Sequence, residues 1–143
     1  MGLVSALRWY LEGFTQRSGI ATAIDVEPLD FSRLTPELET AIFRIIQESL
    51  SNVLRHSKAH KAWITLSLKD GQVIATVRDN GRGIEKPVVE QQPGSIGIGI
   101  SGMSQRAKEF GGELRLATLH PGTLVELVMP CRAAAPQDAC ASA

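Results

Sequence analysis

The chain has 143 residues, 43% of them hydrophobic, which suits one domain with an ordinary core and is too little for two. Lys plus Arg and Asp plus Glu each number 15, so the formal net charge is +0, and no like-charged run favours a nucleic-acid partner. No apolar stretch reaches the roughly 18 residues of a membrane span, and no secretory signal is present. We expect this segment in the cytoplasm and without membrane contact of its own, whether or not a parent protein is anchored.

The amino-terminal half begins with a predicted helix, a strand and a second, longer helix. Apolar residues recur at helical spacing over residues 3–17, and Gly19 follows as a stop signal. Residues 20–26 alternate and are β-prone. Thr35 is a candidate N-cap for a long helix over residues 36–56, which opens on a proline and carries one apolar face.

A hairpin and a long loop come next. Two alternating β-prone runs, 62–68 and 73–77, are joined by a turn that contains Asp70-Gly71, a strong hairpin signal. Residues 79–96 are rich in Gly, Pro, Gln and charge and have no periodicity, which indicates a long loop. Loops of this length are usually functional.

The last third predicts one helix, two strands and a tail. The helix covers about residues 100–110 and ends at Gly111-Gly112, and the strands cover 113–118 and 123–129. The Ala-rich tail, 131–143, has too little bulk to pack and is expected to be disordered. It holds both cysteines, without the spacing of a zinc site.

Polar residues form a stripe beside the apolar face of the long helix. Glu48 and Asn52 are four residues apart, and Arg55 is seven from Glu48, so all three share one side. A carboxamide oxygen suits Mg²⁺, and a carboxylate can orient or deprotonate a nucleophile. The alternative is a solvated helix face. His56, four residues after Asn52, borders the same stripe.

A second motif, Asp-Asn-Gly-Arg-Gly at residues 79–83, lies where a predicted strand ends. Its carboxylate could accept a hydrogen bond from an exocyclic amine such as that of adenine, and the glycines would permit close approach. The alternative is a simple strand-ending turn. A calcium loop of the EF-hand type is excluded because the required Gly and Glu positions do not match.

A third motif, Gly-Ile-Gly-Ile-Ser-Gly at residues 97–102, opens the last predicted helix. Unpaired backbone N–H groups at a helix start could bind phosphates, and a hinge without a ligand is the alternative. No strand precedes the motif, which excludes a dinucleotide-binding Rossmann loop, and no Gly-Lys-Ser/Thr follows it, which excludes a Walker A loop.

Taken together and in this order, the three motifs resemble the GHKL superfamily of gyrase, heat-shock chaperone, histidine kinase and MutL ATPases, whose nucleotide site is the Bergerat fold. Residues 47–59 look like the N box of histidine kinases related to the nitrate and membrane-fluidity sensors, and residues 99–106 look like their second glycine box. Gln105 stands where relatives usually have Glu. The resemblance covers about residues 3–130 and implies a two-layer α/β sandwich, with a mixed, mostly antiparallel sheet packed on three helices.

The resemblance also implies a role for each matching residue. Asn52 would coordinate Mg²⁺, and Glu48 would position or activate the phosphoryl acceptor. Asp79 would hydrogen-bond the adenine amine. His56, as a second catalytic residue, and Lys58 would lie near the phosphates. The other expected nucleotide contacts are Gly81 and Gly83 in the adenine pocket, Gly97, Gly99 and Gly102 on the phosphate side of an ATP lid, Ile84, Met103, and Thr123 acting through water.

By this resemblance the chain would be the ATP-binding catalytic domain of a two-component sensor histidine kinase. It would transfer the γ-phosphoryl group of ATP to a histidine on a separate dimerisation domain, from which an aspartate of a response regulator would receive it. Residues 1–18 would end the linker helix from that dimerisation domain, and residues 19–130 would form the catalytic domain. The alternatives are a GHKL serine kinase of the anti-sigma-factor type and a non-catalytic nucleotide-binding module.

Overall fold

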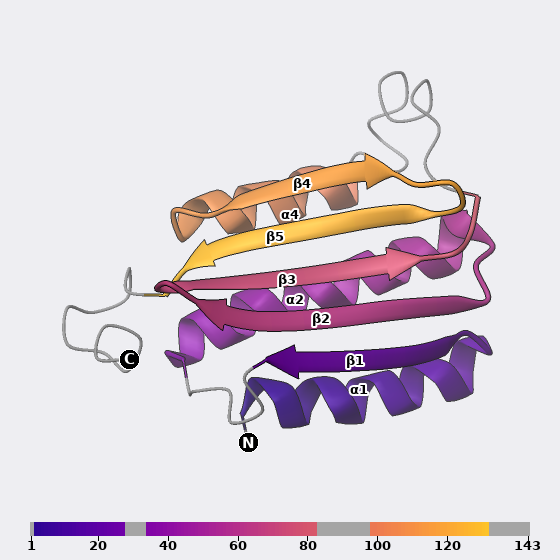
Figure 1. Ribbon diagram of the computed structural model, residues 1–143, viewed down its shortest axis with the longest axis horizontal. Coiled ribbons are helices and arrows are strands. Elements are labelled where there is room, and N and C mark those ends of the chain that lie inside the picture. The colour runs from indigo at the N-terminus through magenta and orange to yellow at the C-terminus, as the bar shows by residue number, and fades with distance from the viewer. Residues whose placement is uncertain (1, 28–33, 83–97, 132–143) are drawn as a thin grey trace.

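The described residues fold into one sheet with three α-helices packed on a single face (Figure 1). The computed structural model describes residues 2–27, 34–82 and 98–131. In chain order the elements are α1 (Leu3–Ser18), β1 (Ala21–Glu27), α2 (Pro36–Asn52), the π-helix η1 (Val53–Ser57), β2 (Lys61–Lys69), β3 (Gln72–Asp79), α4 (Ile98–Glu109), β4 (Glu113–Thr118) and β5 (Thr123–Pro130). The helices and strands expected from the sequence are confirmed, with ends that move by one or two residues except at the end of the long helix.

The five strands are ordered β1-β2-β3-β5-β4, and only the β1–β2 pair is parallel. The mixed, mostly antiparallel sheet expected from the resemblance is therefore confirmed. The β2–β3 hairpin turns at Asp70 and Gly71, whose φ angles of 53° and 75° are both positive. Two central residues with positive φ match the right-handed twist of the flanking strands, which is why Asp-Gly favours this turn.

The core lies between the sheet and the α-helices, and α1, α2 and α4 all contribute buried side chains. Alternate residues of β2 and β3 are buried toward the helices, as the period of two requires. The buried face of α2 repeats at three- and four-residue spacing, so the helix lies lengthwise on the sheet. Its buried members are Leu38, Ala41, Ile42, Ile45, Ile46, Ser49 and Leu50.

Local signals set the helix ends that matter for the site. Thr35 caps α2, where its Oγ1 accepts a hydrogen bond from the backbone N–H of Leu38 at 3.3 Å. Gly19 ends α1 in the left-handed conformation, with φ of 78°. The expectation of a regular α-helix to about residue 56 is wrong, because α2 passes at Val53 into the π-helix η1. Apolar periodicity carries no information about such a wider turn, and such turns often occur at functional sites.

On the opposite face of the sheet, two cations lie within cation–π distance of one tryptophan ring. The guanidinium carbon of Arg78 lies 4.4 Å from the centroid of the Trp63 ring, and Lys61 Nζ lies 5.2 Å from it. Trp63 and Arg78 are cross-strand partners of β2 and β3. Within residues 2–27, 34–82 and 98–131, no helix combines the length and hydropathy needed to cross a membrane.

The packing of α2 predicts a contrast between two leucines one turn apart. Leu50→Ala should lower the free energy of unfolding by about 2–5 kcal/mol, because Leu50 is 0% exposed and the substitution leaves a cavity. Leu54→Ala, at a side chain that is 50% exposed, should change it by only about 0.5 kcal/mol. Urea unfolding followed by circular dichroism measures both, and equal losses would contradict this core.

Candidate functional site

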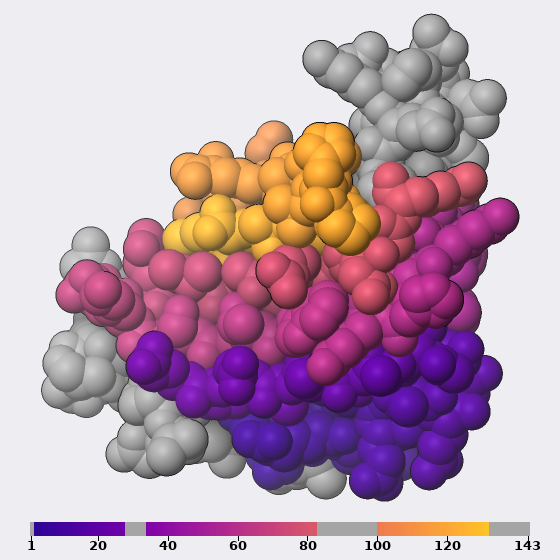
Figure 2. Space-filling model, turned by 45° about the vertical axis from the view of Figure 1, so that its right-hand side comes forward, coloured from indigo at the N-terminus to yellow at the C-terminus, as the bar shows by residue number. Residues whose placement is uncertain are grey.

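One end of the sheet brings together the segments that carry the three motifs. The end of α2 with η1, the end of β3, the start of β5 and the start of α4 all lie at the right-hand side of Figure 1. Figure 2 turns this side toward the viewer and shows the magenta surface of α2 and η1 beside the pink end of β3. Motifs that lie far apart in the sequence therefore share one end of the molecule.

Asp79, the last residue of β3, is a buried acid and only 3% exposed. Its Oδ1 accepts a hydrogen bond from the backbone N–H of Gly81 at 2.8 Å, and the backbone N–H of Thr123 also donates to the carboxylate. Burial raises the pKa of Asp79 above its ordinary value, and the two N–H groups offset part of that rise. The carboxylate is thus held in a fixed orientation in poorly solvated surroundings.

Two glycines let three backbone segments meet around Asp79. A Cβ atom at Gly81 would overlap the carbonyl of Ser57 at the end of η1. One at Gly122 would overlap the carbonyl of Asp79 itself, and Gly122 also has a positive φ of 102°. Gly122 was not singled out from the sequence, yet this residue is what admits the start of β5 to the site.

Residues 79–82, called here the Asp79 turn, are fastened to η1 and to the start of β2. The backbone N–H of Arg82 donates to the carbonyl of Ser57 at 2.8 Å, and Arg82 Nε donates to the carbonyl of His56 at 3.0 Å. Asn80 Oδ1 accepts from the backbone N–H groups of His60 and Lys61 at 2.9 and 3.0 Å. These contacts were not predicted from the sequence, because only the carboxylate and the glycines of this motif were considered there and Asn80 and Arg82 were given no role.

Thr123 leaves an unused polar atom beside the buried acid. Its side chain is 5% exposed, and its Oγ1 is buried without a hydrogen-bond partner among the described residues. Buried hydroxyl groups nearly always have a partner, so an unmatched one points to a missing ligand or water. Asp79 and Thr123 together therefore provide a carboxylate and a hydroxyl that a small polar molecule could satisfy.

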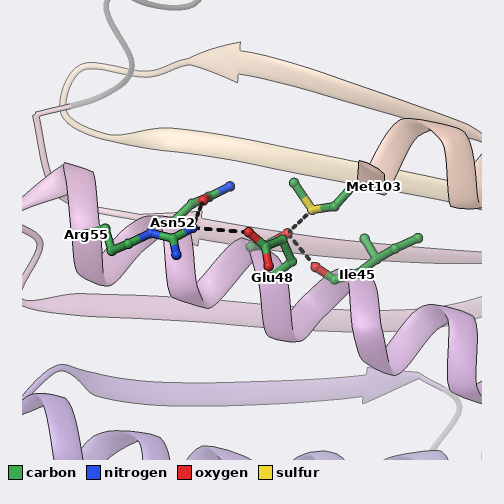
Figure 3. Close-up of polar contacts among 6 residues, drawn as sticks. Ile45, Glu48, Asn52, Arg55 and Met103 are labelled. Carbon is green, nitrogen blue, oxygen red and sulfur yellow. Dashed lines mark hydrogen bonds and ion pairs between the residues drawn. The ribbon is translucent and has the colours of Figure 1, made fainter. Parts of the chain in front are cut away.

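The polar stripe on α2 forms a second cluster, shown in Figure 3. Arg55 Nη2 donates to Asn52 Oδ1 at 2.9 Å and to Glu48 Oε2 at 3.2 Å, so one cation holds both oxygens. The amide oxygen of Asn52 and the carboxylate oxygen of Glu48 are oxygen donors of the kind that Mg²⁺ prefers. No three His, Cys, Asp or Glu side chains gather into a metal site in the part of the chain that the structure describes. A metal here would need phosphate oxygens or water to complete its shell.

A buried hydrogen bond ties α4 to α2 directly next to this stripe. Ser49 Oγ donates to the carbonyl of Ile45 at 2.8 Å and contacts Met103 Sδ at 3.3 Å (Figure 3). Met103 is 3% exposed, so its side chain belongs to the helix interface. The start of α4 is therefore positioned by the same helix that carries Glu48 and Asn52.

The remaining expected site residues are spread over this end of the molecule. His56 contributes its carbonyl to the Asp79 turn, and Lys58 is exposed in a left-handed conformation after η1. Gly102 lies in α4, where an added Cβ would meet nothing within 4 Å. Gly99 also falls inside α4, which begins at Ile98 rather than near residue 100. The remaining three, Gly83, Ile84 and Gly97, lie outside the described residues.

The raised pKa of Asp79 predicts the sign of a pH effect on stability. The folded state keeps the proton to a higher pH than the unfolded state, so the free energy of unfolding falls as the pH rises from the ordinary value, 3.8, through the raised one. Urea unfolding of the wild type and of Asp79→Asn across this pH range isolates the effect. The two proteins share all other titrating groups, so the contributions of those groups cancel in the difference between the two free energies of unfolding. Stability of the wild type relative to Asp79→Asn should decline with pH, and a rise would contradict the burial argument.

Comparison with known proteins identifies the fold and the family. A family model described as histidine kinase-, DNA gyrase B- and HSP90-like ATPase matches residues 37–133. The histidine kinase domain of the blue-light activated kinase of Erythrobacter litoralis EL346 superposes with a TM-score of 0.77 at 23% identity, over 92% of this chain and 62% of that one. The mycobacterial sensor histidine kinase MprB gives 0.67 at 20% identity, over 91% and 95%. These likenesses confirm the two-layer fold.

Curated relatives extend the comparison to sequence. Sensor histidine kinase MctS of Rhizobium johnstonii is 34% identical over 91% of this chain and 28% of its own length. LiaS of Bacillus subtilis is 34% identical over 90% and 34%, and the oxygen sensor histidine kinase NreB of Staphylococcus carnosus is 30% identical over 91% and 37%. The chain thus spans about a third of the length of these relatives. It belongs to the histidine kinase-, DNA gyrase B- and HSP90-like ATPase family, as an ATP-binding domain of the kind found in sensor histidine kinases.

Proposed function

We propose that Asp79 and Thr123 recognise the adenine ring of ATP. The observation that carries this is a buried carboxylate beside a buried hydroxyl for which the described part of the chain offers no partner. An exocyclic amine can donate to the carboxylate, and a water between the hydroxyl and a ring nitrogen would use Thr123 Oγ1. Gly81 keeps the backbone close at this point, and Gly83 and Ile84, which follow in sequence, would extend the pocket.

The phosphates are proposed to lie between α2 and the start of α4. Backbone N–H groups at that helix start would come from Gly97, Gly99 and Gly102. Met103 would anchor the helix on α2. Positive charge or hydrogen bonds would be added by Lys58 and His56. Asn52 would hold Mg²⁺, which when bound neutralises charge on the phosphate oxygens. Glu48 would orient the accepting group. Phosphoryl transfer needs chiefly this positioning and charge neutralisation.

In the parent protein the domain is proposed to phosphorylate a histidine of a dimerisation domain, which would pass the phosphoryl group to an aspartate of a response regulator. Residues 1–18 would then end the linker helix from that domain, residues 19–130 would form the catalytic domain, and residues 131–143 would be a tail. Such a relay uses cytoplasmic ATP, so the domain would face the cytoplasm. The relatives named above are sensor histidine kinases, so a serine kinase of the anti-sigma-factor type and a non-catalytic module are not favoured.

The adenine site predicts a selective loss of nucleotide binding. Asp79→Asn should weaken binding of Mg·ATP about ten- to a hundredfold, because hydrogen bonds to charged groups contribute roughly 1.5–3 kcal/mol. Asp25→Asn, which changes an exposed carboxylate on β1, should leave the affinity unchanged. Calorimetric titration measures all three proteins. Equal affinities, or no binding to the wild type, would refute the assignment of Asp79.

The proposed role of Glu48 predicts a defect in transfer rather than in binding. Glu48→Gln should slow phosphoryl transfer to an added dimerisation domain of the parent by about a hundredfold or more, since a positioned acid or base contributes roughly 10²–10⁴. ATP affinity should stay within about threefold, and Glu37→Gln, at an exposed acid in the first turn of α2, is the matched control.

Radiolabelled ATP and acid treatment of the product identify the acceptor, because phosphohistidine is acid-labile and phosphoserine is stable. Acid-stable label would favour the serine kinase. Absence of any transfer by a wild-type chain that binds ATP would favour the non-catalytic module.

A further inference from the structure

The positive charge at the Glu48–Asn52 cluster is supplied by the chain itself. A single nitrogen, Arg55 Nη2, bridges Asn52 Oδ1 and Glu48 Oε2 at 2.9 and 3.2 Å. Figure 3 shows the Arg55 side chain lying back along α2 toward both residues. These two oxygens are the ones that the proposed function gives to the metal ion and to the phosphoryl acceptor.

The bridge is built so that a stronger cation can displace it. The side chains of Arg55 and Glu48 are 53% and 37% exposed, and ion pairs this open to solvent contribute little to stability. Arg55 lies in η1, the widened turn after α2, and no other hydrogen bond of its guanidinium group is found in the described part of the chain. A divalent ion at Asn52 Oδ1 would repel the guanidinium at close range.

We propose that Arg55 is an internal counter-cation that competes with Mg²⁺ for Asn52 Oδ1 and pairs with Glu48 until Mg²⁺ binds. The inference rests on the proposed function. Before metal binds, Arg55 neutralises Glu48 and holds Asn52 Oδ1 in place. When Mg²⁺ binds, Arg55 leaves, and the Glu48 carboxylate loses its partner at the same moment. Arg55 thus couples arrival of the metal to release of the carboxylate that orients the acceptor.

The test measures how ATP affinity depends on metal, and it does not require turnover. Calorimetric titrations with ATP are made in EDTA and over a series of free Mg²⁺ concentrations for the wild type and Arg55→Met. The Mg²⁺ concentration that gives half of the metal-dependent gain in affinity should be about three- to fivefold lower in Arg55→Met, the scale expected for removal of a surface ion pair. Arg8→Met, at an exposed arginine of α1, should match the wild type.

A double variant separates competition from other roles of Arg55. In the Asn52→Ala background the Arg55→Met shift should vanish, because the shared oxygen is gone. An unchanged or higher Mg²⁺ midpoint in Arg55→Met, in a protein whose wild type binds ATP, would overturn the proposal. So would an equal loss of affinity with and without metal, which would make Arg55 a phosphate ligand only. Failure of the wild type to bind ATP at any Mg²⁺ concentration would instead remove the proposed function itself.

Discussion

The close backbone contact between Gly81 and the carbonyl of Ser57 sets the spacing of the whole site. Because a Cβ atom cannot fit there, the end of β3 and the end of η1 approach more closely than two ordinary segments could. The hydrogen bond from the Arg82 N–H to Ser57 then fixes their relative position. This contact therefore fixes the position of Asp79 on the sheet relative to the Glu48–Asn52 cluster on α2.

The two acidic residues of the site lie in different electrostatic surroundings. Asp79 is buried, which raises its pKa, and two backbone N–H groups hold its carboxylate in one orientation as a hydrogen-bond acceptor. Glu48 is partly exposed and paired with Arg55, so its charge can respond to an arriving ion. The fold thus provides one buried carboxylate in a fixed orientation and one partly exposed carboxylate paired with a surface cation.

Features with local causes were predictable from the sequence. Thr35 caps α2, Gly19 stops α1, and Asp70-Gly71 turns the hairpin because each effect depends on a few neighbouring residues. The π-helix η1 was not predictable, since apolar spacing is nearly the same for one widened turn. Nor were the contacts of Asn80 or the close approach of Gly122. These depend on which distant backbone lies opposite, and that is decided only when the sheet and α2 pack together. The Arg55 bridge is local, because Glu48, Asn52 and Arg55 share one side of α2 and η1, as their spacing predicts.

The cation–π contacts of Trp63 on the face of the sheet away from the helices make this ring an intrinsic reporter of the site. Trp63 lies against Arg78, which directly precedes Asp79. The fluorescence emission of Trp63 depends on the distance and orientation of the Arg78 guanidinium group. Trp9, at 74% exposed on α1, should emit nearly as free indole does in water. The fluorescence of the molecule therefore contains one component that is sensitive to small movements at the end of β3 and one that serves as an internal standard.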